Sequence, residues 1–354
     1  MERFLFRFRP RYYFVLAAIA FTTLWYEQSK TLKSQTRNND LLQKPLRQLS
    51  LQECYERNQV TRYSVLSWIS RDDWMSPPSL FNYGLPDHVF HLVNLDVGEF
   101  PIGHDLISFL GTHLQSHLST QSRLNFLEIG VSVGKSLMTQ LQFFGENALV
   151  MAFDVEDINP TFENMLSPGD HLMLDSFTDE KLVQGAKTLR RKSGSQRVDT
   201  IKQFFSPSGG ELRYLSTDEF NILGWDHLQK QGIIFDLIYS DAFHEPSALL
   251  FEAEQLLTRG LVNLNAFAIV WDDCDGDMVN KGVCPILDKL KIKVGSNVLY
   301  SGVFKIGGWL GVHEELHSTC IMSTLPLYKI WQEDPFLLTR PLMQLSDACS
   351  RKDR

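Results

Sequence analysis

The ten residues LEIGVSVGKS, at Leu127–Ser136, decide the fold of this chain. The apolar run Leu124–Ile129 ends directly in Gly130, Gly134 follows, and Lys135–Phe144 then has helical periodicity. This order predicts a strand, a glycine turn and a helix. Glycines let such a turn bring its backbone close to a ligand, although a glycine pair after a strand can also be a turn and nothing more.

The glycine spacing separates this loop from two common nucleotide-binding loops. Dinucleotide-binding folds use G-x-G-x-x-G, and phosphate-binding loops need four residues between the first glycine and Gly-Lys. Here three residues stand between Gly130 and Gly134, although Lys135-Ser136 follows. The spacing therefore disfavours an NAD-dependent enzyme and excludes a standard phosphate loop.

Around this loop, short apolar runs alternate with helical patterns. Amphipathic helices are expected at His104–Leu118, Lys135–Phe144 and Ala248–Leu257. Further strands are expected at Ala148–Phe153, His171–Leu174, Glu211–Leu215, Ile233–Tyr239, Ala266–Trp271, Asn297–Ile306 and Trp309–Ser323. The polar stretch Thr188–Gly210 indicates an insertion, and Gly307-Gly308 a hairpin turn. The pattern predicts an α/β fold: a Rossmann-like, mostly parallel sheet covered on both faces, with a late antiparallel hairpin.

Ligands of such sheets bind beyond the carboxyl ends of the strands, where this chain places acidic residues. Asp154 follows the second strand and has the chemistry to accept hydrogen bonds from the ribose hydroxyls of an adenosine. Asp175 follows the third strand candidate and could reach an adenine amine. Either acid could instead cap the helix that follows it.

Three more carboxylates end the next two strands. Asp241 closes IIFDLIYSD, and Asp272 and Asp273 close AFAIVWDD. Neighbouring strands would bring them together, and like charges so close call for protonation or a metal ion. Hard oxygen donors suit Mg²⁺ or Mn²⁺, and helix capping is the alternative. His244, three residues past Asp241, is either a proton acceptor for a hydroxyl substrate or a structural histidine.

Taken together, these residues resemble the class I S-adenosylmethionine-dependent methyltransferases. The loop LEIGVSVGKS is similar to their first motif, acid-x-Gly-x-x-x-Gly-x-Ser. The resemblance covers roughly Leu124–Thr324 and implies a sheet of about seven strands. It also implies that the cofactor is bound by Glu128, Gly130, Ser132, Gly134, Ser136, Asp154 and Asp175.

Within that superfamily, the chain most resembles metal-dependent O-methyltransferases of the catechol type and a related bacterial group. Those enzymes have a metal-binding Asp after the fourth strand, as at Asp241, and a second acidic pair after the fifth, as at Asp272 and Asp273. Their base lies three residues past the first Asp and is a histidine in the bacterial group, as at His244. The resemblance implies O-methylation of a sugar or small molecule. The alternative is a non-catalytic, methyltransferase-like interaction protein.

The amino terminus predicts a membrane anchor. Residues 1–11 contain four arginines, and residues 12–26 run YYFVLAAIAFTTLWY without a charge. The positive-inside bias predicts a cytosolic tip, a span at 12–26, a polar stem at 27–60 and a lumenal domain at 61–354, in the Golgi or endoplasmic reticulum. A signal peptide or a buried or transit segment is the alternative. The absence of an N-x-[ST] sequon weakens the lumenal assignment.

Composition narrows the partners further. The formal net charge of −8 and the lack of clustered basic residues, apart from Arg190-Arg191-Lys192, argue against nucleic-acid binding. Five cysteines match no metal-binding spacing. Cys274 and Cys284 could pair in an oxidising compartment, or all five could be ordinary thiols.

Overall fold

The computed structural model describes residues 46, 48–58, 103–118, 122–131, 134–155, 200–206, 208–274, 276–294, 300–307, 316–339, 342–345 and 349. All of them belong to one compact unit, Leu46–Arg354. Several predictions fall outside these residues: the span at 12–26, the strand at His171–Leu174, and the cofactor contacts of Ser132 and Asp175. No helix of the described residues has the length and apolar character needed to cross a bilayer.

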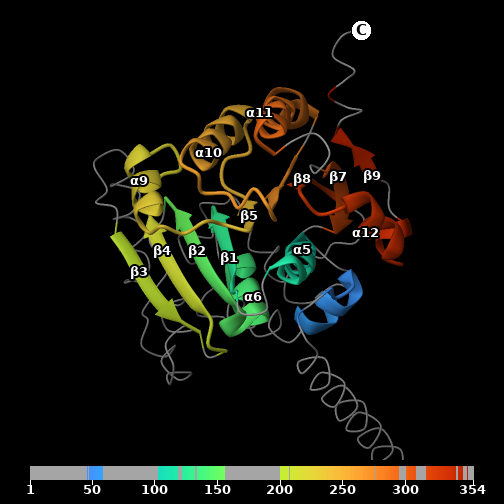
Figure 1. Cartoon of the computed structure of the whole chain (residues 1–354), viewed down its shortest axis with the longest axis horizontal. Coiled ribbons are helices and arrows are strands. Elements are labelled where there is room, and N and C mark those ends of the chain that lie inside the picture. Colours follow the sequence, from blue (N-terminus) through green and yellow to red (C-terminus); the bar gives the residue numbers. More distant parts are fainter. Residues whose placement is uncertain are drawn as a thin grey trace, which may run out of the picture. The chain divides into compact units, whose positions relative to one another are not determined.

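One nine-stranded sheet organises the described chain, in the order β3-β4-β2-β1-β5-β6-β8-β7-β9 (Figure 1). Its strands are β1 Leu124–Ile129, β2 Ala148–Asp154, β3 Thr200–Phe205, β4 Glu211–Ser216, β5 Leu237–Ser240, β6 Ala268–Trp271, β7 Tyr300–Gly307, β8 Leu316–Ser323 and β9 Leu342–Gln344. Strands β4, β2, β1, β5 and β6 are parallel, and β7 and β8 form an antiparallel pair beside β6. The predicted mostly parallel sheet with a late antiparallel hairpin is confirmed, but it has nine strands where about seven were expected, since β3 and β9 add an antiparallel strand at each edge.

Helices cover both faces of this sheet. They are α5 Gly103–His117, α6 Lys135–Phe144, α9 Ile222–Lys230, α10 Pro246–Thr258, α11 Cys284–Val294 and α12 Leu327–Glu333, with the short 3-10 helices η2 Gly145–Asn147 and η5 Leu337–Thr339 and the π-helix η4 Met278–Val283. Alternate residues of each strand enter two separate cores, because successive side chains of a strand point to opposite faces. On β1, Phe126 packs in the core that contains α5 and α6, whereas Leu127 packs in the core that contains α9, α10 and α11.

The edge of the sheet beyond β2 differs from the prediction. Glu211–Ser216 pairs in parallel with β2 and so takes the third position, for which His171–Leu174 was the other candidate. Part of the predicted insertion Thr188–Gly210 is also a strand, because Thr200–Phe205 pairs antiparallel with β4. The glycines that indicated a loop form a tight hairpin turn: the Ser206 amide donates to Gly210, and Gly209 has φ +81°.

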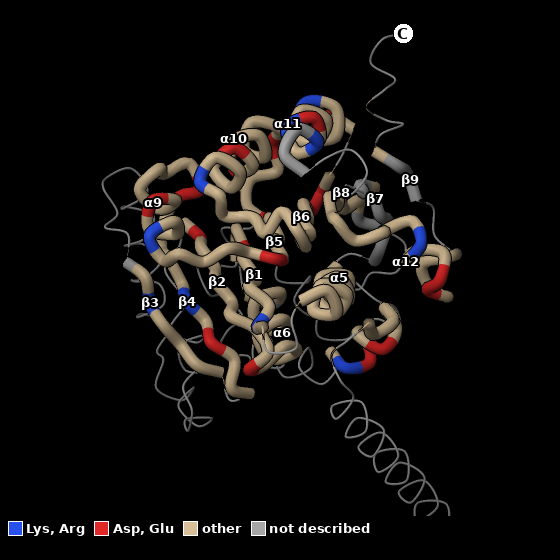
Figure 2. Tube along the Cα trace, in the orientation of Figure 1, with Lys and Arg blue, Asp and Glu red and all other residues tan. Residues whose placement is uncertain are grey.

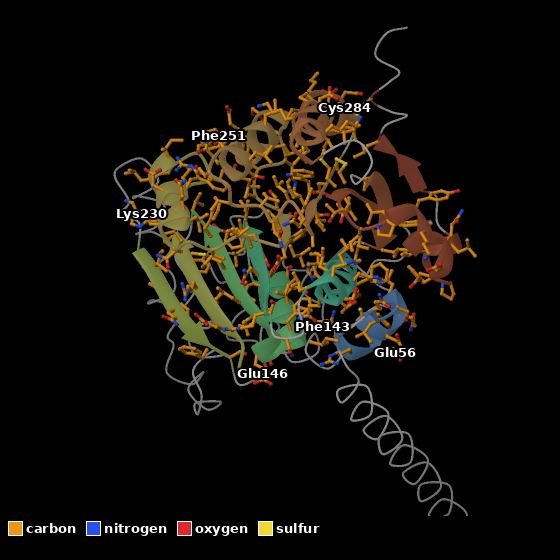
Figure 3. All side chains as sticks on the ribbon, in the orientation of Figure 1. Glu56, Phe143, Glu146, Lys230, Phe251 and Cys284 are labelled. Carbon is orange, nitrogen blue, oxygen red and sulfur yellow. A yellow bond between two sulfur atoms is a disulfide. The ribbon has the colours of Figure 1, made fainter. Side chains whose placement is uncertain are left out.

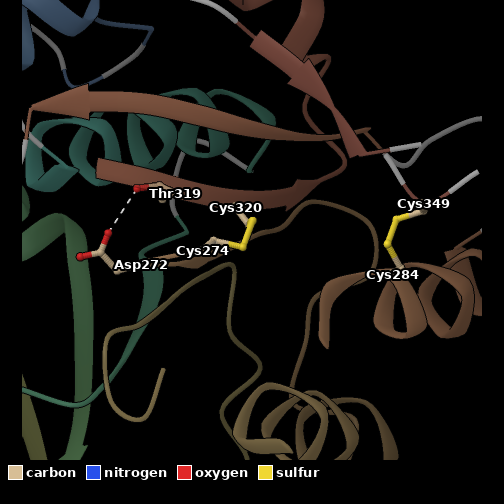
Figure 4. The surroundings of a disulfide bond; sticks show 6 residues. All are labelled: Asp272, Cys274, Cys284, Thr319, Cys320 and Cys349. Carbon is tan, nitrogen blue, oxygen red and sulfur yellow. Dashed lines mark hydrogen bonds between the residues drawn. A yellow bond between two sulfur atoms is a disulfide. The ribbon is translucent and has the colours of Figure 1, made fainter. Parts of the chain in front are cut away.

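Two disulfides connect the second half of the sheet, Cys274–Cys320 and Cys284–Cys349 (Figure 4). Neither alternative from the sequence holds: Cys274 and Cys284 do not pair with each other, and only Cys54 is an ordinary thiol. Cys274 leaves β6 next to β8, where Cys320 lies 5.6 Å away between Cα atoms, while Cys284 begins α11. Cys54 is a buried free thiol.

Lys and Arg are dispersed among Asp and Glu over the described elements rather than gathered on one of them (Figure 2).

Candidate functional site

The glycine loop lies between the carboxyl ends of β2 and β5. Gly130 has φ +79° and Gly134 has φ +74°, a left-handed conformation that glycine adopts without strain. The Gly130 amide donates to Phe153, and a Cβ added at Gly130 would lie 2.5 Å from the Cα of Ala242. Only glycine therefore fits where this loop passes the end of β5.

Asp154, the last residue of β2, holds the glycine loop in place through a hydrogen bond. Its Oδ2 accepts a hydrogen bond of 2.6 Å from the Val131 amide, and the residue is 8% exposed. Gly134 is the N-cap residue of α6 and has no side chain. The first backbone amides of the helix therefore receive no side-chain hydrogen bond from their cap. Amides at a helix start attract anionic groups. The glycine loop, Asp154 and the start of α6 together form a candidate cofactor site, called the cradle below.

Glu128 is the buried acid of this cradle. It is 1% exposed, and its Oε2 has no hydrogen-bond partner among the described residues. Burial, followed by the nearby charge of Asp241, raises the pKa of the Glu128 carboxyl well above its usual range. A buried carboxyl oxygen without a partner fits a ligand that brings its own hydrogen-bond donor, such as an amino group.

The acids that end β5 and β6 meet at the same edge. The Asp241 amide donates to Ile129 and the Asp272 amide to Ser240, so the strand ends are level. His244 joins two of the acids: Nε2 lies 3.0 Å from Asp241 Oδ1, and Nδ1 lies 3.1 Å from Asp273 Oδ2. The predicted convergence of Asp241, Asp272, Asp273 and His244 is present in the structure.

Two hydroxyl groups complete the cluster. The Tyr239 hydroxyl lies 3.2 Å from Asp241 Oδ2 and 3.3 Å from Asp272 Oδ2. Thr319, on β8, donates to Asp272 Oδ1 at 3.2 Å (Figure 4). Neither residue is among those predicted from the sequence. Tyr239 belongs to an apolar strand and Thr319 to a strand far along the chain, so only the spacing of Tyr239, two residues before Asp241 and on the same strand face, could have indicated a role.

The donor set suits a hard divalent cation, because it consists of carboxylate oxygens from neighbouring strand ends. In the present arrangement His244 and Tyr239 lie between the acids. Within the described ranges, no group of three or more His, Cys, Asp and Glu side chains is close enough to hold a metal ion. The carboxylate oxygens have the chemistry that suits a divalent cation, whereas their present placement does not form a metal-binding group.

The environment of His244 favours its charged form. Hydrogen bonds to Asp241 first, and to Asp273 next, raise the pKa of the imidazole to about 10. At neutral pH the side chain is therefore an imidazolium that pairs with two carboxylates and offsets one of their two charges. It becomes a proton acceptor only when these carboxylates are engaged by another cation.

This shift predicts a pH dependence of stability for the metal-free protein. Folded His244 keeps its proton up to a pKa of about 10, whereas the unfolded chain releases it near 6.5. The contribution of His244 is thus complete below about pH 6.5 and disappears as the pH rises through about 10. We expect the Tm in EDTA to fall more steeply over this window in the wild type than in His244→Gln. Parallel curves would contradict this role of His244.

Two further buried acids lie near the cluster formed by Asp241, Asp272 and Asp273. Glu219, in the loop after β4, and Glu252, on α10, are 6% and 1% exposed. Burial raises the pKa of both carboxyl groups, and the Ser240 hydroxyl donates to Glu252 Oε1 at 3.0 Å. Glu219 follows β4, which takes the sheet position beside β2 that could also have gone to His171–Leu174. Glu219 was therefore not predicted as a residue at a strand end.

Exposed aromatic side chains border the acidic cluster. Phe243, between Asp241 and His244 in the chain, is 51% exposed and packs edge-on against Phe220 at 6.3 Å between ring centroids. Phe220 also contacts Phe251 of α10, which Figure 3 labels. These rings offer an apolar surface beside the carboxylates.

No protein-family model and no curated protein matches this chain. Among solved structures, it is similar to the O-methyltransferase TomG from Streptomyces achromogenes in complex with SAM, at 14% identity and a TM-score of 0.36, covering 73% of this chain and 95% of TomG. It is also similar to the O-methyltransferase from Bacillus cereus in complex with SAH, at 14% identity and a TM-score of 0.33, covering 73% and 96%. The match to the methyltransferase MycE of the mycinamycin pathway, in complex with Mg and SAH, has 14% identity and a TM-score of 0.27, and covers 47% of this chain and 32% of MycE. Likeness at this level does not establish an activity, which must be argued from the residues of the chain itself.

Proposed function

We propose that this chain is an S-adenosylmethionine-dependent methyltransferase that acts on a hydroxyl group, assisted by a divalent cation held by Asp241, Asp272 and Asp273. The observation that carries the proposal is the meeting of two sets of residues at one sheet edge. The glycine loop, fastened by Asp154, lies directly against the end of β5 at Asp241 and Ala242. A cofactor in the cradle would therefore adjoin the acidic cluster.

The cradle residues have distinct roles in this proposal. Gly130 and Gly134 give the backbone its turn, and Glu128 accepts a hydrogen bond from the amino group of the methionine part. Asp154 interacts with the ribose and Asp175 with the adenine amine, and Ser132 and Ser136 are further cofactor contacts in the loop. Burial favours the neutral form of Glu128, and a cationic amino group brought in by the cofactor would stabilise its carboxylate, because little solvent competes with that contact.

The transfer itself is a displacement at carbon. An oxygen lone pair of the acceptor forms the new C–O bond, the C–S bond breaks, and its electrons neutralise the sulfonium, leaving S-adenosylhomocysteine. The acceptor proton passes to the imidazole of His244. A divalent cation, when bound, supplies Lewis acidity that lowers the pKa of the acceptor hydroxyl. The protein also has to hold the acceptor oxygen, the methyl carbon and the sulfur in a line, which is the geometry of the displacement.

We further propose that the protein works in the lumen of the Golgi or endoplasmic reticulum, anchored by residues 12–26. Two disulfides support an oxidising compartment, because such bonds are rare in the cytosol. A lumenal position favours a glycan or a small hydroxyl compound as the acceptor. The exposed Phe243 and Phe220 suit the apolar face of a sugar ring or of an aromatic acceptor.

Cofactor binding is the first test. Calorimetric titration of the full chain in detergent with S-adenosylmethionine should give saturable binding, and the absence of binding would end this proposal. Incubation of cell extracts with the protein and methyl-labelled cofactor, followed by mass spectrometry, then identifies the acceptor. Binding without transfer to any extract component would favour a non-catalytic interaction protein.

Removal of divalent cations should separate binding from transfer. We expect EDTA to abolish methyl transfer and added Mg²⁺ or Mn²⁺ to restore it, while S-adenosylmethionine binding persists because the cradle contains no proposed metal ligand. The measurement is the transfer rate and the cofactor Kd in the same samples. Transfer that is indifferent to EDTA would assign the acids to direct positioning of the acceptor.

A further inference from the structure

A buried chain of hydrogen bonds joins the helical residues 51–58 (blue in Figure 1) to α5 and α6. Nδ2 of Asn58 donates to Oγ of Ser108 at 3.0 Å, and the Ser108 hydroxyl donates to Oε1 of Gln140 at 2.8 Å. Nε2 of Gln140 in turn donates to the His104 carbonyl at 2.8 Å. Asn58, Ser108 and Gln140 are each at most 1% exposed, so little water competes with these bonds.

The hydrogens available on these groups give the chain of bonds a direction. Nδ2 of Asn58 has two hydrogens, and its second acceptor is Asp105 Oδ1 at 3.0 Å. The Ser108 hydroxyl has one hydrogen, and Gln140 Oε1 is nearer to it than the His104 carbonyl, which lies 3.2 Å away. The bonds therefore run from Asn58 through α5 to α6, and Ser108 is the link between the two sides.

A polar network is a costly way to fill this part of the core. Oδ1 of Asn58 is buried and has no hydrogen-bond partner among the described residues, a cost that an apolar side chain would avoid. The neighbouring positions Leu106 and Leu110 on α5 and Leu137 on α6 are buried in the apolar core. Apolar packing thus supplies the cohesion of the two helices, and the hydrogen bonds add a fixed orientation of α6 against α5.

The orientation of α6 matters because its first turn is part of the cradle. Gln140 lies four residues after Ser136, so both side chains project from the same face of the helix. Burial, and then the charge of Asp241, raise the pKa of the Glu128 carboxyl, whereas Ser136 and the Leu137 amide act to lower it. The start of α6 therefore faces Glu128, and a rotation of the helix would move Ser136 and the first backbone amides relative to that acid.

We propose that Ser108 and Gln140 are positioning residues for the cofactor, and that Asn58 makes the helical residues 51–58 part of the cofactor-binding unit. Together they fix the rotation of α6, so that its first turn meets the amino-acid end of the cofactor beside Glu128. This inference rests on the proposed cofactor site. None of the three positioning residues belongs to the glycine loop or to a strand end.

Ser108→Ala tests the proposal, because it removes the hydroxyl that joins Asn58 to Gln140. We expect the Kd of the full chain for S-adenosylmethionine, measured by calorimetric titration, to rise about 3- to 30-fold, as for residues that act on a site through packed contacts. The KM for the cofactor should rise in parallel, with kcat at saturating cofactor nearly unchanged. Gln140→Met, which keeps the length of the side chain, should have the same effect, and the double variant should bind no more weakly than the weaker single variant.

Thr112→Val is the matched control. Thr112 lies one turn after Ser108 on α5 and is fully buried as well. Its hydroxyl accepts from the Leu49 amide and donates to the Phe109 carbonyl, and neither bond involves α6. We expect this variant to lose about as much Tm as Ser108→Ala and to keep the cofactor Kd of the wild type.

The outcomes separate the inference from the proposed function. A lower Tm in Ser108→Ala and Gln140→Met, with the cofactor Kd unchanged, would overturn the inference and leave the proposed function intact. An equal rise of the Kd in Thr112→Val would overturn it as well, because general loosening of α5 would then explain the effect. A folded wild-type chain that binds no cofactor would overturn the proposed function, and the inference with it.

Discussion

Asp241→Asn should lower kcat/KM for methyl transfer by at least about 100-fold, because it removes the charge that faces both the cofactor loop and the acidic cluster. A metal-polarised hydroxyl is worth several kcal/mol of barrier, and each 1.4 kcal/mol is about tenfold in rate. Asparagine has nearly the same size and keeps an oxygen for Tyr239, so the fold should persist. Transfer rates at saturating Mg²⁺, with Tm as a folding check, measure the effect.

The control for this variant is Asp277→Asn. The Asp277 side chain is 67% exposed and pairs with Lys281 one helical turn away, a surface contact that contributes little. We expect its activity to match the wild type. A loss below about tenfold in Asp241→Asn would remove Asp241 from the metal site.

Gly130→Ala is expected to cost roughly 3–5 kcal/mol in free energy of unfolding and to abolish cofactor binding. Two effects add: alanine at φ +79° is strained, and its Cβ would lie 2.5 Å from Ala242 Cα and 2.6 Å from the Asp241 carbonyl oxygen. These neighbours are backbone atoms of the adjacent strand end, so relief requires displacing Asp241 or the loop. Chemical denaturation and cofactor titration measure both consequences.

Gly232→Ala is the control that separates the cost of left-handed backbone strain from the cost of a steric clash. Gly232 has φ +66°, but nothing lies within 4 Å of an added Cβ. We expect it to cost only the left-handed strain, about 1–2 kcal/mol, with cofactor binding intact. Similar losses in the two variants would show that the contact of Gly130 with the end of β5 does not matter.

Much of the fold follows from local pattern. β1 and α6 have the predicted bounds, because an apolar run, two glycines and helical periodicity follow one another without ambiguity. The prediction failed at β3, where the polar residues of an edge strand and the glycines of its hairpin turn resembled a loop. Edge strands bury one face at most, so their hydrophobic signal is weak.

In the candidate site too, some residues could be predicted from local sequence pattern and others could not. The strand-end rule located Asp154, Asp241, Asp272 and Asp273, since each follows an apolar run in the sequence. It could not locate Thr319, whose contact with Asp272 depends on the pairing of β6 with β8. Contacts across antiparallel pairs are set by register, which single-sequence periodicity does not determine.

The two disulfides interlace, and this affects how the protein can be made. During synthesis Cys274 and Cys284 leave the ribosome before Cys320 and Cys349 exist, so the first partner that either thiol meets is a non-native one. Any bridge formed between these two thiols has to be exchanged through an attacking thiolate before the native bonds can form. We therefore expect a thiol–disulfide isomerase, supplied together with an oxidant, to raise the yield of correctly bridged protein.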